Sequence, residues 1–105
     1  MLDAVVKSGD WSQRVRVAIG FFDRLTGLRR ASIGDSLLIR ARSVHGFGMR
    51  HSLLVVGIDP DMTVIGTKTL RPRRVVGFRE AIYLLELPLD SNPPSAGSPI
   101  EIEHG

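Results

Sequence analysis

Three side chains able to carry acid–base or ligand chemistry fall in two short blocks of an otherwise apolar part of the chain. His45 and Met49 belong to the stretch 43–50 (SVHGFGMR), and Glu86 lies in 84–88 (LLELP). In the predicted strand, Glu86 shares a face with Ile82 and Leu84, an apolar setting in which carboxylates are rare. An imidazole beside a half-buried carboxylate can exchange a proton or hold a ligand. The candidate pocket residues are His45, Met49, Arg50 and Glu86.

The same residues have a structural interpretation, which we favour. A buried carboxylate must find hydrogen-bond donors, and the backbone amides of the loop around His45 would supply them. Glu86 would then fix the shape of that loop without doing chemistry. A metal site is not expected, because His45 and His51 are six residues apart and no carboxylate stands at ligand spacing.

Arginines make a second candidate site. They account for twelve of the 14 basic residues, and a guanidinium can bind phosphate, nucleic acid or an acidic protein partner through paired hydrogen bonds. The alternative is a solvated basic surface. Aromatic residues are 6% of the chain and mostly look like core, which leaves no platform for stacking bases, so nucleic acid is not expected. The candidates for anion or partner binding are Arg42, Arg71, Arg73 and Arg74, beside Arg50.

The composition is that of a soluble globular protein, with 43% hydrophobic and 24% charged residues. The 105 residues fit a single domain, and we expect residues 1–13 and 88–99 to be flexible. The chain has no cysteine, which removes disulfides and thiol chemistry, and no cofactor is implied. Residues 1–13 lack the apolar run of a signal peptide, and 53–58 is too short to span a bilayer. We therefore expect a cytoplasmic location.

The charge is unevenly distributed along the chain. The net charge is +3, with +6 on residues 1–88 and −3 on residues 89–105. An excess of arginine over most of the chain suits contact with an acidic partner. The protein partner or small molecule that binds, and the oligomeric state, do not follow from this pattern.

Residues 53–58 (LLVVGI) are apolar on both faces, which predicts a strand in the middle of the core. The turn Asp59-Pro60-Asp61 and the returning strand 62–70 complete a hairpin. Residues 14–19 alternate, with Val15 and Val17 on the buried face and Ala18 on the exposed face.

The remaining patterns predict short strands and one helix. Residues 21–30 have apolar residues at near-helical spacing and predict a short amphipathic helix. We therefore predict a mainly β protein, a small antiparallel β-sandwich or barrel with one short helix. Further strands are predicted at 4–6 (an edge strand), 37–39, 75–76, 81–87 and 100–102.

In their order and spacing, the H-x-F-x-M-R block at 45–50 and the L-E-L-P block at 85–88 give the chain its resemblance to a known family. From about residue 15 to 103, it resembles the prokaryotic family called domain of unknown function 192. The resemblance implies a β-sandwich of jelly-roll type and no established activity. Some relatives are exported, and some appear beside pilus or secretion genes.

The chain departs from the pattern of that family in three places. The family usually has proline, an apolar residue and aspartate where Ser52, Leu53 and Leu54 stand here, so a carboxylate is lost. It usually has a small residue and glycine at Leu89 and Asp90, and a threonine at residue 20. We therefore expect a non-catalytic binding or accessory module, linked to an envelope or secretion system. The alternative is an enzyme or small-molecule-binding protein with a pocket near His45 and Glu86.

Overall fold

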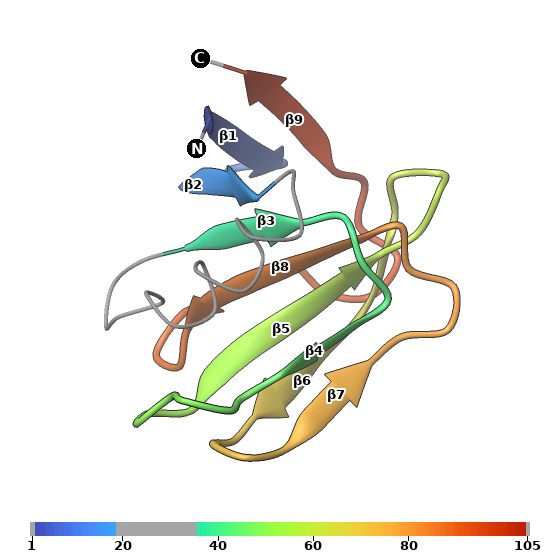
Figure 1. Ribbon diagram of the computed structural model, residues 1–105. Helices are drawn as coiled ribbons and strands as arrows, with labels where there is room; N and C mark the ends of the chain where they lie inside the picture. Colours follow the sequence, from blue (N-terminus) through green and yellow to red (C-terminus); the bar gives the residue numbers. More distant parts are fainter. Residues whose placement is uncertain (1, 19–35, 105) are drawn as a thin grey trace.

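The structure, a computed structural model, describes residues 2–18 and 36–104, and within them the chain forms nine β-strands and no helix (Figure 1). The mainly β class predicted from the sequence is confirmed. The helix predicted over 21–30 lies outside the described residues. The strands are β1 (Leu2–Ser8), β2 (Trp11–Ala18), β3 (Leu37–Ile39), β4 (Ser43–His45), β5 (Leu53–Ile58), β6 (Val64–Leu70), β7 (Val75–Gly77), β8 (Tyr83–Pro88) and β9 (Glu101–His104).

Seven strands form one sheet in the order β6-β5-β8-β3-β2-β1-β9, and β4 and β7 form a separate two-stranded sheet. Every pair is antiparallel except β2 with β3, which run parallel. Strands β1 and β9 pair at one end of the large sheet, so the two ends of the described chain lie side by side (Figure 1). The mostly antiparallel arrangement is as predicted, and the jelly-roll type stays a prediction.

The predicted central hairpin is confirmed as β5 and β6, with β8 on the other side of β5. Its turn is held by the Asp59 side chain, because Oδ1 accepts hydrogen bonds from the backbone amides of Asp61 (2.9 Å) and Thr63 (3.0 Å). Met62 follows with a positive φ of 60°, a conformation that such side-chain capping stabilises in tight turns. The register of β5 with β6 shifts once near this turn, between Gly57 and Ile58, and is regular from Gly57 to the open end.

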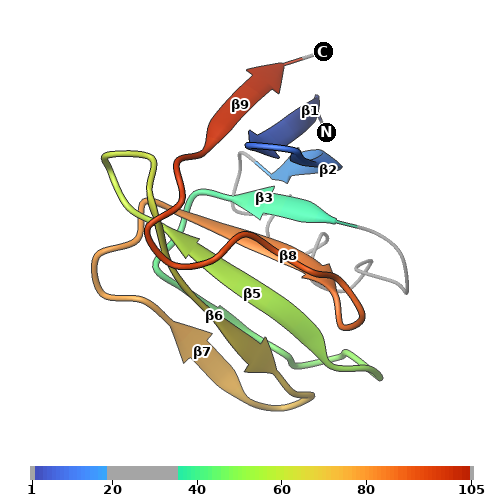
Figure 2. The same ribbon diagram turned by 180° about the vertical axis from the view of Figure 1, so that it is seen from behind.

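Buried side chains form two clusters on the opposite faces of the large sheet. Neighbouring strand residues point to opposite faces, so Val55 belongs to one cluster and Val56 to the other. The small β4–β7 sheet covers the Val55 face, where Val44 and Phe78 pack. The chain between β8 and β9 runs back across the other face (Figure 2). Both faces of the central strands are therefore inside the protein.

Phe78 packs on a pair of glycines. Gly57 of β5 and Gly66 of β6 stand opposite each other, and a Cβ at residue 57 would lie 2.5 Å from Phe78 Cγ. The Nζ atom of Lys68 lies 4.5 Å from the centre of the Phe78 ring and donates a hydrogen bond to the Gly77 carbonyl. The glycine at residue 57 is required for this approach of the two sheets.

The structure corrects two details of the predicted strands. Residues 4–6 were expected in an edge strand, but β1 lies between β2 and β9, and β9 forms the edge. Ala18 was expected on an exposed face, but it is 1% exposed and packs in the Val55 cluster. The alternation of Val15 and Val17 is confirmed, since both are buried while Arg14 is exposed. A sheet covered on both faces explains the buried Ala18.

The loop predicted to be flexible at 88–99 is hydrogen-bonded to β6 at its far end. The amide of Gly97 donates to the Val64 carbonyl, and the amide of Val64 donates to the Ser98 carbonyl. Flexibility of the loop stays a prediction, and it applies best to the part before residue 97. Within the described residues, no helix is long and apolar enough to cross a membrane.

Candidate functional site

The three central strands end side by side, and the loops that leave them carry most of the predicted site residues. Leu53 at the start of β5 pairs with Leu70 at the end of β6 and with Pro88 at the end of β8. Arg50 comes shortly before Leu53, and Arg71 comes directly after Leu70. The two arginines therefore flank strand positions that are direct neighbours in the sheet. At the opposite end of the sheet, Ile58 pairs with Tyr83. The two ends of the sheet form separate surfaces.

Backbone hydrogen bonds join the loop after β4 to the loop after β6. The Gly46 amide donates to the Arg74 carbonyl (2.8 Å), and the Arg73 amide donates to the Gly46 carbonyl (3.1 Å). A Cβ at residue 46 would overlap the carbonyl oxygen of Arg71, so only glycine permits this contact. The contact fixes the position of residues 71–74 relative to residues 45–50.

This contact gathers arginines and two apolar side chains on one surface. Arg73 has a φ of 65°, a left-handed conformation that is unfavourable for residues other than glycine. Phe47 and Val75 leave 55% and 62% of their surfaces exposed. We call this group the basic surface; its residues, all exposed, are Phe47, Arg50, Arg71, Arg73, Arg74 and Val75.

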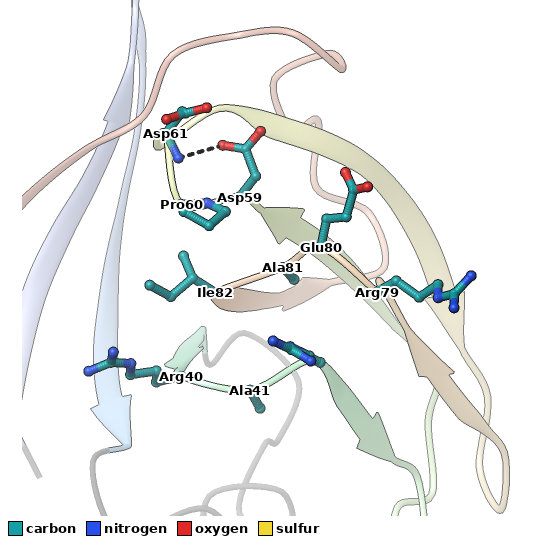
Figure 3. A pocket seen from close by; sticks show the side chains of 10 residues that line it. Arg40, Ala41, Asp59, Pro60, Asp61, Arg79, Glu80, Ala81 and Ile82 are labelled. Atoms are coloured by element: carbon teal, nitrogen blue, oxygen red, sulfur yellow. Dashed lines mark hydrogen bonds between the residues drawn. The ribbon is translucent and has the colours of Figure 1, made fainter.

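The structure separates Arg42 from the other predicted arginines. Arg42 precedes β4, whereas Arg50 and Arg71 lie beyond its far end. Arg42 lines a cavity of about 740 Å³ at the opposite end of the sheet, together with Arg40 and Arg79. In Figure 3, the side chains of Arg40 and Arg79 extend in opposite directions, away from the centre of this cavity. The single anion site proposed from the sequence is therefore two groups of arginines.

His45, Met49 and Glu86 do not form the hydrogen-bonded network considered from the sequence. His45 lies in β4 opposite Val75, and its ring is 5.1 Å from the ring of Phe47. The buried His45 Nδ1 has no hydrogen-bond partner among the described residues. Met49 packs, partly buried, on the Val55 cluster. Neither carboxyl oxygen of Glu86 has a hydrogen-bond partner among the described residues, so His45 lacks the contact to Glu86 that proton exchange needs.

Glu86 is buried in the middle of β8, between Leu37 of β3 and Val55 of β5. Its side chain is 1% exposed, and neither carboxyl oxygen has a hydrogen-bond partner in the described part of the chain. Burial raises the pKa of Glu86 to about 8, because an apolar environment disfavours the carboxylate. Glu86 is therefore uncharged at neutral pH. The interpretation of Glu86 as a clamp for the amides around His45 is wrong.

A cavity that the sequence did not predict lies where the two sequence blocks meet. It has a volume of about 440 Å³, and its lining includes Arg50, the last residue of the first block, and Pro88, the last residue of the second. The signal was present in the sequence as the two blocks themselves, but their contact depends on the pairing of Leu53 with Pro88. The lining residues are Arg50, His51, Ser52, Leu53, Pro88, Leu89 and Asp90.

Metal ligands do not gather anywhere in residues 2–18 and 36–104. No group of three or more His, Cys, Asp or Glu side chains stands close enough to hold an ion there. His51 lines the smaller cavity, whereas His45 does not.

Comparison with known proteins places the chain in a family. No family model matches it. Over 91 residues, it is 32% identical to a UPF0127 protein of Pyrococcus abyssi, and the match covers 79% of this chain and 78% of that protein. The chain belongs to the UPF0127 family. A UPF0127 protein of Pyrococcus horikoshii is also 32% identical, over 90 residues and 78% of each chain.

The UPF0127 relatives are uncharacterised, so the predicted membership of an uncharacterised conserved family is confirmed. Two crystal structures share the fold of this UPF0127 protein. One, a protein of unknown function from Novosphingobium aromaticivorans, has a TM-score of 0.70 at 13% identity and covers 94% of this chain and 83% of its own. The other, a suggested transcription regulator from Sinorhizobium meliloti, has a TM-score of 0.74 at 21% identity and covers 95% and 92%.

Proposed function

We propose that this UPF0127 protein is a non-catalytic binding module that docks an acidic protein partner on its basic surface. The observation that supports this is the backbone contact between Gly46 and residues 71–74. It holds four arginines in place on one end of the molecule, including Arg73 in an unfavourable backbone conformation. Strained residues of this kind concentrate at functional sites.

The charge and the apolar side chains of the basic surface suit a protein partner. Residues 43–52 and 71–75 contain no Asp or Glu, so within these two segments the arginine charges have no carboxylate neighbour in the sequence. Arg and aromatic residues are the types that most often dominate binding energy in protein interfaces. Phe47 and Val75 therefore serve as apolar contacts, and the arginines serve as the partners of acidic side chains.

The support for a non-catalytic role comes from His45 and Glu86. Neither residue lines the cavity of about 740 Å³ or the cavity of about 440 Å³. Each has a buried polar atom without a hydrogen-bond partner in the described part of the chain. A general acid and base must reach the reacting atom within hydrogen-bond distance. We therefore propose no catalytic residue, cofactor or metal for this protein.

The finer parts of the assignment are also proposals. We propose that the UPF0127 relatives are members of domain of unknown function 192, and that the module serves an envelope or secretion system from the cytoplasm. We propose that the 105 residues act as one domain, since one sheet joins β1 near the start of the chain to β9 near its end. Nucleic acid is the competing ligand, given the description of the Sinorhizobium meliloti structure.

The test is binding of a fluorescein-labelled peptide of alternating glutamate and leucine, followed by fluorescence anisotropy. Changing Arg71→Gln and Arg73→Gln together should weaken binding by about tenfold or more, equivalent to about 1.4 kcal/mol or more. The matched control changes Arg14→Gln and Arg16→Gln, two exposed arginines of β2, and should leave the affinity unchanged. His45→Ala should also bind normally.

Three outcomes would contradict the proposed function. One is equal loss of affinity in both arginine pairs, which would mean non-specific attraction to a basic protein. Another is unchanged binding by the Arg71 and Arg73 variant. The third is tighter binding of a DNA duplex than of the peptide, with an affinity that falls steeply as salt is added.

A further inference from the structure

We infer that the cavity between residues 50–53 and 88–90 binds a small zwitterion with an apolar body, such as a free apolar amino acid or a short apolar peptide. This site is separate from the docking of an acidic partner, although both use Arg50. The inference rests on the shape of the cavity, its apolar floor and two opposite charges on its walls.

The cavity is built on the aligned ends of two central strands. Leu53 opens β5 and is 3% exposed, and it pairs with Pro88 at the end of β8. Leu89 follows and leaves 54% of its surface exposed. These three side chains give an apolar floor and rim, and the volume of about 440 Å³ falls in the range of small-molecule sites. The apolar part of a ligand therefore has a place to be buried.

The walls carry opposite charges that do not neutralise each other. Arg50 and Asp90 line the same cavity. Within the part of the chain that the structure describes, an ion pair joins Lys7 and Glu103 at 3.0 Å, but neither Arg50 nor Asp90 forms one. A simple anion would be attracted by Arg50 and repelled by Asp90, and a simple cation would meet the reverse. A zwitterion satisfies both groups, with its carboxylate on Arg50 and its ammonium on Asp90.

Polar groups beside Arg50 strengthen the anion end of the site. His51 and Ser52 line the same cavity as Arg50, and a hydroxyl and an imidazole nitrogen can each donate a hydrogen bond to a carboxylate. Asp90 is the acidic residue of the lining and belongs to the loop after β8. The ligand would therefore lie with its carboxylate toward the loop before β5 and its ammonium toward the loop after β8.

The larger cavity lacks this arrangement. Its arginines and carboxylates are equal in number, but the Asp59 carboxylate already holds the hairpin turn. Figure 3 shows Arg40 and Arg79 pointing outward rather than into the hollow. Arg40 and Arg79 therefore face outward and Asp59 serves the turn, and we place the ligand in the smaller cavity.

The experiment is titration of the protein with L-leucyl-L-leucine, followed by heteronuclear NMR and calorimetry. Amide shifts should concentrate at residues 50–53 and at residues 89 and 90. Asp90→Asn and Arg50→Gln should each weaken binding by about tenfold or more, equivalent to about 1.4 kcal/mol or more. Arg79→Gln, a charge change at the opposite end of the sheet, is the control and should bind normally. Titration with free leucine then shows whether a single amino acid or a short peptide fits better.

Chemical variants of the ligand make the test sharper. N-acetyl-leucyl-leucine lacks the ammonium, so it should bind the original protein as weakly as leucyl-leucine binds the Asp90→Asn variant. Asp90→Asn should not weaken binding of the acetylated ligand further, because the ammonium that Asp90 would contact is already absent. Leucyl-leucine amide lacks the carboxylate, so it should bind the original protein as weakly as leucyl-leucine binds the Arg50→Gln variant. Arg50→Gln should not weaken its binding further.

Three results would overturn the inference: shifts centred on other residues, equal binding of acetylated and free dipeptide, and no detectable binding. Asp90→Asn also separates the two proposals. It removes a negative charge near the basic surface, so it should keep or improve binding of the glutamate–leucine peptide while it weakens binding of leucyl-leucine. If the original protein binds only one of these two ligands, the proposal that predicted binding of the other has failed.

Discussion

Replacing Glu86 with glutamine should change how the stability of this protein depends on pH. Glutamine resembles protonated glutamic acid in shape but does not ionise. Burial raises the pKa of Glu86 from 4.5 to about 8 in the folded protein, whereas the unfolded chain keeps a value near 4.5. Between these two values, the unfolded chain has released the proton and the folded protein still holds it. Stability is therefore greatest below the unfolded pKa and is lost as the pH rises toward about 8.

The size of the effect follows from the interval between the two pKa values of Glu86. Each pH unit in that interval lowers the free energy of unfolding by about 1.4 kcal/mol. From 4.5 to about 8, the loss is about 5 kcal/mol, and above that range it stays constant. Small domains have total stabilities of about 5–15 kcal/mol. A single buried carboxyl thus decides much of the stability of this protein in mildly alkaline solution.

The assay is urea unfolding of three proteins at several pH values between about 4 and 9. The original protein and the Glu86→Gln variant should differ by an amount that grows by about 5 kcal/mol across this range. With a denaturant slope of about 2 kcal/mol per molar, the urea midpoints separate by about 2.5 M. Glu101→Gln alters an exposed carboxylate of β9 and should follow the original protein, since other titrating groups are common to all three.

Parallel pH profiles for the original protein and the Glu86→Gln variant would refute this reasoning. Such a result would mean that Glu86 ionises in the folded protein near its ordinary pKa, so that burial does not govern its charge. A direct check is the carbon-13 NMR titration of the Glu86 side-chain carboxyl. A midpoint near 8 supports the burial argument, and a midpoint near 4.5 removes it.

Three further substitutions test the contacts that shape the fold and the basic surface. Gly57→Ala forces a Cβ into the Phe78 ring and should lower the free energy of unfolding in urea by about 1–3 kcal/mol. Gly66→Ala is the control: its Cβ would lie 3.6 Å from Phe78 Cε1, so it should destabilise the protein less. Asp59→Ala removes two turn hydrogen bonds and should cost about 1–2 kcal/mol by thermal unfolding; full stability would mean that the turn needs no side chain. Gly46→Ala should weaken binding of the glutamate–leucine peptide in the anisotropy assay, and unchanged affinity would show that the loop contact is not required.

Local pattern predicted the central strands of this protein well. Residues 53–58 are apolar on both faces, which is the pattern of a strand covered on both sides. The prediction for Val15 and Val17 also succeeded, because apolar residues that recur at every second position of a strand identify its buried face. The prediction for Ala18 failed because the second face of β2 is buried there as well, which the local alternation does not show.

The candidate site could be predicted only in part, because it depends on pairing between distant segments. Glu86 is unusual as a carboxylate among apolar neighbours, and its burial agrees with that pattern, but the pattern does not reveal its lack of hydrogen-bond partners in the described part of the chain. Arg42 looked like a member of the arginine group because it is near Arg50 in the chain. Strand β4 lies between Arg42 and Arg50 in the sequence, so the two arginines lie beyond opposite ends of that strand. The smaller cavity exists because Leu53 pairs with Pro88, a register that no local pattern specifies.

The basic surface separates residues that hold the loops from residues that would contact a partner. The loops are held by backbone groups of Gly46, Arg73 and Arg74, and the arginine side chains are exposed. Changing those side chains should therefore alter binding with little effect on stability, because surface substitutions away from buried contacts are nearly neutral. Gly46→Ala should reduce both, since it displaces the loop itself. Binding and stability that changed together in the Arg71 variant would show that this separation does not hold.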